Sequence, residues 1–173
     1  IGKSTAIKFV EAGWKVICWG RRYKKMEAWK KNLPEIEQKR IFLQGVDVMS
    51  ENQVTEAIQL IPKKFKVIDL LVNNAGLALG KSPIHKGLIK DWEQMIDTNL
   101  KGLLYVTKII SSDMVDRKSG QIINIGSIAG KETYPDGNVY NATKFAVDAL
   151  TRAMRQDLSQ HQIRVSQICP GMV

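Results

Sequence analysis

The chain has 173 residues, of which 44% are hydrophobic and 25% charged, a composition typical of one globular domain with a sizeable core. No apolar run approaches the roughly 18 residues of a membrane-spanning helix, so we expect no membrane partner. The formal net charge of +9 would suit a nucleic-acid partner, but no recognition motif accompanies the basic residues. We therefore expect no nucleic-acid partner.

The two cysteines, Cys18 and Cys169, both fall in predicted strands. They suit buried free thiols in a reducing compartment better than a disulfide, and we expect a cytoplasmic protein. No cluster of Cys and His has the spacing of metal ligands, so no metal site is predicted. The histidines, His85 and His161, lie in polar surroundings and are expected to face solvent.

The first half of the chain alternates helices and strands. Helices are predicted over residues 5–12, 24–32 and 51–61, and strands over residues 15–19, 40–46 and 67–72. Gly13 is a good C-terminal cap for the first helix, and Ser50 is a good N-cap with Gln53 at the capping-box position.

The second half continues the alternation with longer elements. Helices are predicted over residues 90–117 and 138–159, and strands over residues 121–126 and 163–169. Several strands are apolar on both faces, which predicts a parallel sheet covered by helices on each side. The fold class is therefore α/β, a doubly wound parallel sheet in three α/β/α layers, and we expect residues 1–173 to form a single domain.

Ligands of such sheets bind beyond the carboxyl ends of the strands. Five groups of residues follow predicted strands directly, and we expect them to share one edge of the sheet. They are Gly20–Arg21–Arg22, Asp47–Val48, Asn74–Ala75–Gly76, Ser127 and Pro170–Gly171.

The first residues, Ile1-Gly2-Lys3-Ser4, open a helix and fit the end of two phosphate-binding loops. One is the glycine-rich turn of a dinucleotide-binding domain, where pyrophosphate meets a helix N-terminus. The other is the P-loop, which ends in the same Gly-Lys-Ser. A P-loop enzyme also needs an acidic residue after a neighbouring strand, and Asp47 is a weak candidate. The first residues alone leave both interpretations open.

Arg21 and Arg22 stand where an NAD-specific domain carries an acidic residue for the ribose. Two guanidinium groups at this position can bind a 2′-phosphate through charge-assisted hydrogen bonds. The sequence therefore favours NADP(H) over NAD(H).

A second constellation lies between Gln121 and Lys144. Ser127 follows a strand, and Tyr140 and Lys144 lie four residues apart, so a helix from Asn138 would stack phenol and ammonium on one face. A hydroxyl, a phenol and a cation beyond a strand end outline a proton-transfer site. The surroundings of Ser127 do not match G-x-S-x-G, so a serine hydrolase is not predicted.

Asn99 is a poor helix former inside a predicted helix. A local bend or a side-chain hydrogen bond would account for it, as would a helix-start cap.

These motifs, in this order and spacing, resemble the short-chain dehydrogenase/reductase family over essentially the whole chain. The matching residues are Asn73–Asn74–Ala75–Gly76, Asn99, Ser127, Tyr140, Lys144 and Pro170–Gly171. The resemblance implies a Rossmann-like fold whose first and last strands are missing from this chain.

The resemblance also implies roles. Ser127 orients the substrate oxygen, Tyr140 is the acid/base and also binds substrate and cofactor, Lys144 binds the nicotinamide ribose, and Asn99 holds a proton-relay water. Further cofactor contacts are implied near the N-terminus and after the strands. They are Ile1, Gly2, Arg21, Arg22, Asp47, Val48, Asn74, Ala75, Gly76, Pro170, Gly171 and Val173.

Residues 77–80, Asn138-Val139-Tyr140 and Gly20-Arg21-Arg22 are similar to the subgroup that acts on 3-hydroxy acids, including serine and allo-threonine. The implied function is an NADP-dependent oxidoreductase acting on a secondary alcohol or carbonyl. A homo-oligomer, dimer or tetramer through the two long helices, is also implied. The alternatives are a P-loop nucleotide-binding protein and a non-catalytic NADP(H) sensor or scaffold.

Overall fold

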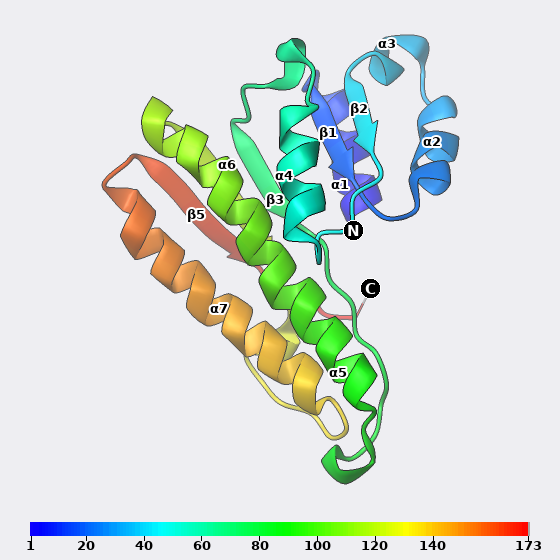
Figure 1. The fold of residues 1–173 in the computed structure, drawn as a ribbon, viewed down its shortest axis with the longest axis vertical. Helices are drawn as coiled ribbons and strands as arrows, with labels where there is room; N and C mark the ends of the chain where they lie inside the picture. The colour runs from blue at the N-terminus through cyan, green and yellow to red at the C-terminus, as the bar shows by residue number, and fades with distance from the viewer. Residues whose placement is uncertain (173) are drawn as a thin grey trace. The chain divides into compact units, whose positions relative to one another are not determined.

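A computed structural model describes residues 1–172, and the chain divides into two compact units. The first unit is Ile1–Val67 and the second begins at Ile68. Parallel strands with helices packed on them build each unit (Figure 1). The predicted α/β class with parallel strands is confirmed.

Short helices and two short strands make up the first unit. Its elements are α1 (Gly2–Glu11), β1 (Val16–Trp19), α2 (Tyr23–Lys31), α3 (Glu35–Gln38), β2 (Ile41–Gln44), α4 (Glu51–Gln59) and the 3-10 turn η1 (Lys63–Phe65). β1 and β2 pair in parallel with Val16 opposite Ile41. Both strands are rich in apolar and aromatic side chains, which favours extended backbone in a half-buried sheet.

Helices cover both faces of this sheet. On one face, Val10 of α1 packs with Ile41 and Leu43 of β2. On the other face, the Gln44 amide donates a 3.0 Å hydrogen bond to the carbonyl of Ala57 in α4. Side chains alternate along a strand, so each face receives every second residue. The predicted three layers are therefore present within this unit.

The ends of two elements follow the chemistry expected of them. Gly13, with φ of +90°, closes α1 in a conformation that favours glycine. The Ser50 hydroxyl accepts a 3.3 Å hydrogen bond from the amide of Gln53 and so caps α4. The Gln53 side chain differs from the predicted capping box: it accepts from the Asp47 amide at 2.9 Å, while the Ser50 amide donates to the Asp47 carbonyl at 3.0 Å.

The second unit has longer elements. They are β3 (Leu70–Asn73), η2 (Ile84–Lys86), α5 (Ile89–Ile96), the π-helical segment η3 (Asp97–Gly102), α6 (Leu103–Arg117), β4 (Gly120–Ile125), η4 (Ile128–Gly130), α7 (Asn138–Ser159) and β5 (Ile163–Ile168). The strands form a parallel sheet in the order β3-β4-β5. Leu70 lies opposite Gln121, and Gly120 lies opposite Ile163.

One face of this sheet is covered by α6 and α7, which run side by side (Figure 1). The buried layer between them consists of apolar side chains from strands and helices. It contains Met114, Ile122, Val147, Met154 and Val165. The carboxyl ends of β3, β4 and β5 lie at one edge of the sheet because all three strands are parallel.

A buried polar chain crosses this layer. The Asn73 amide donates to Asn124 at 2.8 Å and to Thr107 at 2.9 Å. The Asn124 amide in turn donates to Thr151 at 2.9 Å. All four side chains are buried, so these bonds join β3 and β4 to both covering helices without leaving the polar groups unpaired.

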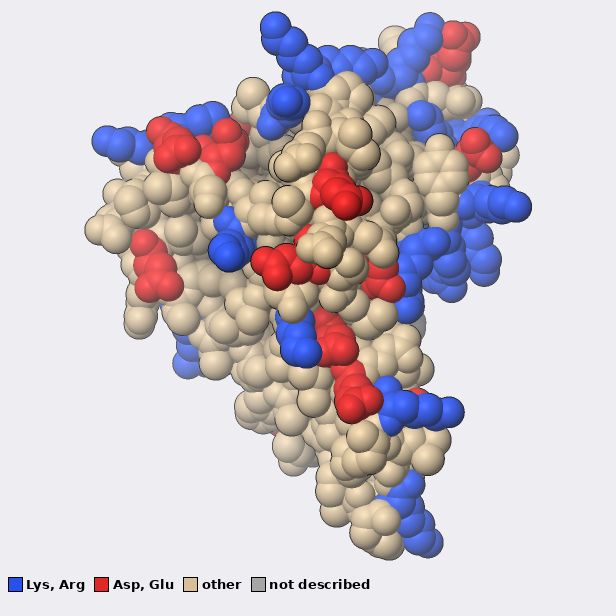
Figure 2. Space-filling view, viewed as in Figure 1, with Lys and Arg blue, Asp and Glu red and all other residues tan. Residues whose placement is uncertain are grey.

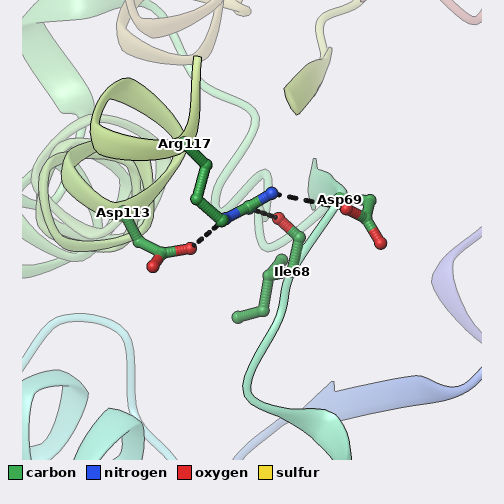
Figure 3. Close-up of polar contacts among 4 residues, drawn as sticks. All are labelled: Ile68, Asp69, Asp113 and Arg117. Carbon is green, nitrogen blue, oxygen red and sulfur yellow. Dashed lines mark hydrogen bonds and ion pairs between the residues drawn. The ribbon is translucent and has the colours of Figure 1, made fainter. Parts of the chain in front are cut away.

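Arg117 fixes the end of α6 to the chain entering β3 (Figure 3). Its guanidinium donates to Asp113 at 2.8 Å and to the backbone carbonyl of Ile68 at 2.7 Å, and it lies 3.5 Å from the Asp69 carboxylate. The guanidinium can contact all three acceptors at once because its five donors point outward in one plane.

Two predicted elements need correction, and one helix was missed. The strand predicted over residues 67–72 begins only at Leu70, because Val67 is exposed and the carbonyl of Ile68 bonds to Arg117. The helix predicted over residues 90–117 is interrupted by the π segment η3. The short helix α3 was not predicted; it follows Pro34, whose ring fixes the backbone angle that starts it.

Basic side chains gather around α2 on the face seen in Figure 2. α2 itself carries Lys24, Lys25, Lys30 and Lys31, and Lys31 pairs with Glu27 at 3.4 Å.

Among residues 1–172, the helices are all too short or too polar to span a bilayer.

We predict that Asn124→Leu lowers the free energy of unfolding by about 1–3 kcal/mol, because it leaves buried donors or acceptors on Asn73 and Thr151 with fewer partners. Urea unfolding measures the loss. Ile123→Leu, on the same strand, is the matched control and is expected to be near neutral. An Asn124→Leu protein as stable as the wild type would contradict the importance of the polar chain.

Candidate active site

The four predicted catalytic side chains all lie in the second unit. Asn99 is in η3, Ser127 follows β4, and Tyr140 and Lys144 lie on the first turns of α7. The Lys144 ammonium lies 5.8 Å from the centroid of the Tyr140 ring. The helix over residues 138–159 therefore brings phenol and ammonium together as its spacing predicts.

Lys144 is a buried charge. Its side chain leaves the residue only 6% exposed, and Nζ donates a 3.0 Å hydrogen bond to the carbonyl of Ile125 at the end of β4. Burial lowers the pKa of Lys144 from the ordinary 10.5, and the neighbouring Cys169 opposes this in part. An ammonium has three donors, and the bond to Ile125 uses one of them.

Asn99 joins three segments of the chain. Its Oδ1 accepts from the Leu77 amide at 2.9 Å, while Nδ2 donates to the Leu77 carbonyl at 2.9 Å and to the Thr143 hydroxyl at 3.0 Å. The residue is 2% exposed and lies inside the π segment. Both the local irregularity and the side-chain hydrogen bond expected for Asn99 are present, and a helix-start cap is not.

Ser127 is buried in the turn that follows β4. Its hydroxyl accepts a 3.1 Å hydrogen bond from the amide of Ala129 and so caps η4. η4 packs closely on α7, since a Cβ on Gly130 would lie 2.5 Å from the Lys144 carbonyl oxygen. Lys131, just after η4, pairs with Asp148 of α7 and lowers the pKa of that carboxyl through its hydrogen bond.

The other strand ends of this unit flank the same residues. Asn74, Ala75 and Gly76 follow β3 and are exposed. A Cβ on Gly76 would lie 3.3 Å from Asn99 Oδ1 and 3.6 Å from Lys144 Nζ, so this turn borders the buried amide and ammonium.

After β5, the carbonyl of Pro170 accepts from the Ile128 amide at 3.0 Å, which places Pro170 and Gly171 beside η4. Val173, also predicted to contact the cofactor, lies outside the described residues.

The remaining predicted cofactor residues belong to the first unit. Gly2 begins α1, and Ile1 precedes it with its carbonyl accepting from the Thr5 amide at 3.0 Å. Arg21 and Arg22 follow β1 and are exposed. That these residues share an edge with those of the second unit stays a prediction.

Asp47 and Val48 follow β2 in the same unit. The Asp47 carboxylate accepts from the Met49 amide at 3.1 Å, which folds the chain into a tight turn. Asp47, the weak candidate for the acidic residue of a P-loop enzyme, therefore bonds within its own turn.

One residue of this region, Thr143, was not singled out from the sequence, and the side-chain contact of Asn138 was not predicted. Thr143 receives the hydrogen bond from Asn99, and Asn138 donates to the Ser82 carbonyl at 2.9 Å, which ties the loop before α5 to the start of α7. Thr143 lies within the Tyr-x-x-x-Lys spacing, but nothing in the sequence marks it as a partner of Asn99.

Within residues 1–172, no group of His, Cys, Asp and Glu could hold a metal ion. Both cysteines are free thiols, and burial raises the pKa of Cys18 to about 11. His85 is exposed as expected, whereas His161 is half-buried.

Comparison with known proteins identifies the family of the chain. The family model described as short chain dehydrogenase matches residues 1–173. The NADP-dependent 3-hydroxy acid dehydrogenase of Salmonella typhi is 45% identical over 172 residues, which are 99% of this chain and 68% of that protein. Serine 3-dehydrogenase of Rhizobium radiobacter is 41% identical over 171 residues, 99% of this chain and 67% of the relative.

Solved structures are similar over the same range. Serine dehydrogenase from Escherichia coli superposes with a TM-score of 0.94 at 42% identity, covering 99% of this chain and 77% of that one. The closed form of serine dehydrogenase complexed with NADP+ also has a TM-score of 0.94 and 42% identity, with coverage of 99% and 67%. The chain therefore belongs to the short-chain dehydrogenase family and is an oxidoreductase.

Proposed function

We propose that this chain forms a single catalytic domain that transfers a hydride between NADP(H) and a secondary alcohol or carbonyl, with Tyr140 as the acid/base. The substrate we propose is a small 3-hydroxy acid such as serine or allo-threonine. The observation that carries the proposal is the buried Lys144 ammonium held 5.8 Å from the Tyr140 ring, one helical turn away. Burying an ammonium costs a fold stability, so a buried ammonium beside a phenol is a candidate functional group.

The residues around Lys144 fit a nicotinamide nucleotide. Nζ bonds to Ile125 with one donor, and the other two can bind ribose hydroxyls. Gly76, exposed beside Nζ and Asn99, carries no side chain that would fill the space a cofactor approaches. Pro170 and Gly171 follow β5 and lie beside η4, where the nicotinamide would lie.

Two lines support NADP(H) over NAD(H). Arg21 and Arg22 follow β1 with no acidic residue at the strand end, and neither forms an ion pair within residues 1–172. Guanidinium groups in such a position suit a 2′-phosphate. The Salmonella relative is NADP-dependent and the similar solved serine dehydrogenase is complexed with NADP+. We assign the adenine contacts to Asp47 and Val48, and the pyrophosphate to the start of α1 at Ile1 and Gly2.

The proposed mechanism divides the reaction between cofactor and protein. The bound nicotinamide supplies the hydride acceptor or donor. In alcohol oxidation Tyr140 accepts the hydroxyl proton as the hydride leaves the carbon, and in carbonyl reduction it returns that proton. Lys144 stabilises the phenolate through its charge and orients the ribose. Asn99 is engaged by Leu77 and Thr143, and we propose that it orders the proton-relay water beside Lys144.

Ser127 is suited to hold the reacting oxygen. Its hydroxyl oxygen already accepts from the Ala129 amide at 3.1 Å, which fixes the side chain and leaves the O–H to donate. That O–H and the Tyr140 phenolic oxygen would bracket the alcohol or carbonyl oxygen, with Tyr140 accepting a proton in oxidation and donating it in reduction. Such paired contacts align the substrate for transfer.

The substrate class rests on the relatives. The relatives named 3-hydroxy acid dehydrogenase and serine 3-dehydrogenase each match this chain over more than two thirds of their own length. The alternatives are less well supported. A P-loop enzyme needs an acidic residue for Mg²⁺ after a neighbouring strand, and Asp47 is bonded to its own turn. A sensor or scaffold would not need Asn99, Ser127, Tyr140 and Lys144 together.

We also propose a homo-oligomer, a dimer or tetramer formed through α6 and α7. Each of these helices carries a large apolar side chain that is about two fifths exposed, Leu104 at 41% and Phe145 at 40%. Covering such side chains favours association. The free thiols of Cys18 and Cys169 support a reducing compartment and the cytoplasm as the location.

We predict that Tyr140→Phe retains NADPH binding and loses turnover by about a thousandfold or more, because the phenyl ring keeps the packing and removes the proton donor. NADP⁺ reduction with serine, allo-threonine and other 3-hydroxy acids measures turnover, and NADPH fluorescence measures binding. Tyr105→Phe, on α6, is the matched control. Near-wild-type turnover in Tyr140→Phe would sink the assignment.

Arg21→Ala with Arg22→Ala is expected to weaken NADPH binding by about tenfold to a hundredfold and to leave NADH binding within about twofold, since charge-assisted hydrogen bonds contribute about 1.5–3 kcal/mol. Isothermal titration with both cofactors gives the ratio. Lys24→Ala with Lys25→Ala removes the same charge from α2 and serves as the control. Equal losses for NADPH and NADH would argue against a 2′-phosphate site.

Lys144→Met is expected to change how stability depends on pH in the cofactor-free protein. The pKa of Lys144 is lowered by burial, so between its folded value and 10.5 the unfolded chain binds more protons than the folded one. The free energy of unfolding of the wild type therefore increases as pH rises toward 10.5, and Lys144→Met lacks this increase. The stability advantage of the variant should shrink over this window.

Urea unfolding from pH 7 to 10.5 measures this difference. Lys101→Met is the control, because the hydrogen bond to Asp97 raises the pKa of Lys101 and places any loss of stability above 10.5. A pH-independent difference between Lys144→Met and the wild type would show that the buried ammonium has no such cost.

A further inference from the structure

Among residues 1–172, Thr143 is the one side chain that bonds both to Asn99 and to the turn of α7 that carries Tyr140. It is 1% exposed. Its hydroxyl accepts from Asn99 Nδ2 at 3.0 Å and donates to the Tyr140 carbonyl at 2.8 Å. We propose that Thr143 is a positioning residue that holds the Tyr140–Lys144 turn in register with Asn99; the proposal rests on the proposed function.

The direction of this hydrogen-bond chain is fixed by the groups at its ends. The Leu77 amide can only donate, so it meets Oδ1 of Asn99 and leaves Nδ2 to face the Leu77 carbonyl and Thr143. The Tyr140 carbonyl can only accept, so the Thr143 proton points to it. Each group in this hydrogen-bond chain is therefore fixed as a donor or an acceptor, and the Asn99 side-chain amide has one possible orientation.

The Tyr140 turn needs such an anchor. α7 begins at Asn138, and Gly137 before it provides no side-chain cap. The first turn of a helix lacks backbone partners for its amides. In α7 the Val139 amide donates to the Asn138 side chain at 2.8 Å, and that side chain donates to the Ser82 carbonyl at 2.9 Å. Tyr140 lies within that turn, so the position of its phenol depends on bonds to other elements. Thr143 supplies one of these bonds, and through Asn99 it extends to the loop after β3.

The bond to the Tyr140 carbonyl would be unremarkable alone. A threonine inside a helix commonly bonds to a carbonyl three or four residues earlier, and Thr55 does so with Glu51 at 3.0 Å. What sets Thr143 apart is the bond it receives from Asn99, 44 residues away in the chain. That second bond connects the π segment to the helix that carries Tyr140 and Lys144.

The chain offers a matched control two turns further along α7. Thr151 is also 1% exposed; it donates to the Val147 carbonyl at 2.7 Å and accepts from the Asn124 amide at 2.9 Å. Its bonding repeats that of Thr143, but its partner, Asn124, is away from Tyr140 and Lys144. A structural role alone would make the two threonines equivalent.

The test compares Thr143→Val, Thr143→Ser and Thr151→Val in the protein. We expect Thr143→Val to lower kcat by about tenfold or more and to weaken NADPH binding by a smaller factor, because the displaced turn carries Lys144, one of several proposed cofactor contacts. Thr143→Ser keeps the hydroxyl and should restore kcat to within about threefold of the wild type. Thr151→Val should lose comparable thermal stability and keep its kcat.

A wild-type kcat in Thr143→Val overturns the proposal, as do losses of kcat that follow only the loss of stability in both valine variants. If Thr143→Val does not fold, Thr143→Ala removes the same hydroxyl without the second methyl group and is judged by the same values.

A readout independent of turnover separates this proposal from the proposed function. In a crystal structure of Thr143→Val, we expect the Tyr140 ring and Lys144 Nζ to leave the 5.8 Å separation of the wild type. An unchanged Tyr140–Lys144 turn overturns the role of Thr143. Absence of NADP(H)-dependent turnover in the wild type contradicts the proposed function instead.

Discussion

The Asn99 carboxamide is the constraint on which the second unit's arrangement depends. It pairs with both backbone groups of Leu77 and with the Thr143 hydroxyl, so the loop after β3, the π segment and α7 meet at one buried side chain. A carboxamide can do this because it carries an acceptor and two donors in one plane. The π segment is the local irregularity that accompanies this residue, and such bulges inside helices are frequent at functional sites.

The buried ammonium of Lys144 is the second constraint, and it opposes stability. Its only bond to the chain among residues 1–172 is to the Ile125 carbonyl, and burial lowers its pKa. An apolar side chain would pack here with less desolvation. Retaining a charge beside Tyr140, Gly76 and the end of β4 is reasonable only where a ligand completes its hydrogen bonds, which is the physical link between this fold and a cofactor.

Much of this arrangement can be predicted from the sequence because it depends on local patterns. The helix predicted from near Asn138 to about Ser159 matches α7, and the Tyr140–Lys144 spacing requires no more than a helix. The carboxyl-end rule for parallel strands gathers Asn74, Ser127 and Pro170 without any knowledge of contacts. The only sequence signal for the π segment within the long predicted helix is Asn99, because asparagine has a low helix propensity.

What the sequence does not predict depends on long-range partners. The late start of β3 follows from Arg117 bonding to the carbonyl of Ile68, which lies 49 residues away. Thr143 looks like any helical threonine until Asn99 is seen beside it. Such bonds arise from the packing of distant segments, and no periodicity, cap or turn signal in the chain encodes them.

The central claim is that Asn99, Tyr140 and Lys144 are arranged in advance for the ribose of NADP(H). A crystal structure of the protein with NADP⁺ bound tests it most directly. We predict ribose hydroxyls within hydrogen-bonding distance of the Tyr140 hydroxyl and Lys144 Nζ, with the Asn99 bonds to Leu77 and Thr143 unchanged. Two results would contradict this arrangement. One is a cofactor bound away from Lys144, and the other is an Asn99 side chain that breaks its hydrogen bonds to Leu77 when the cofactor binds.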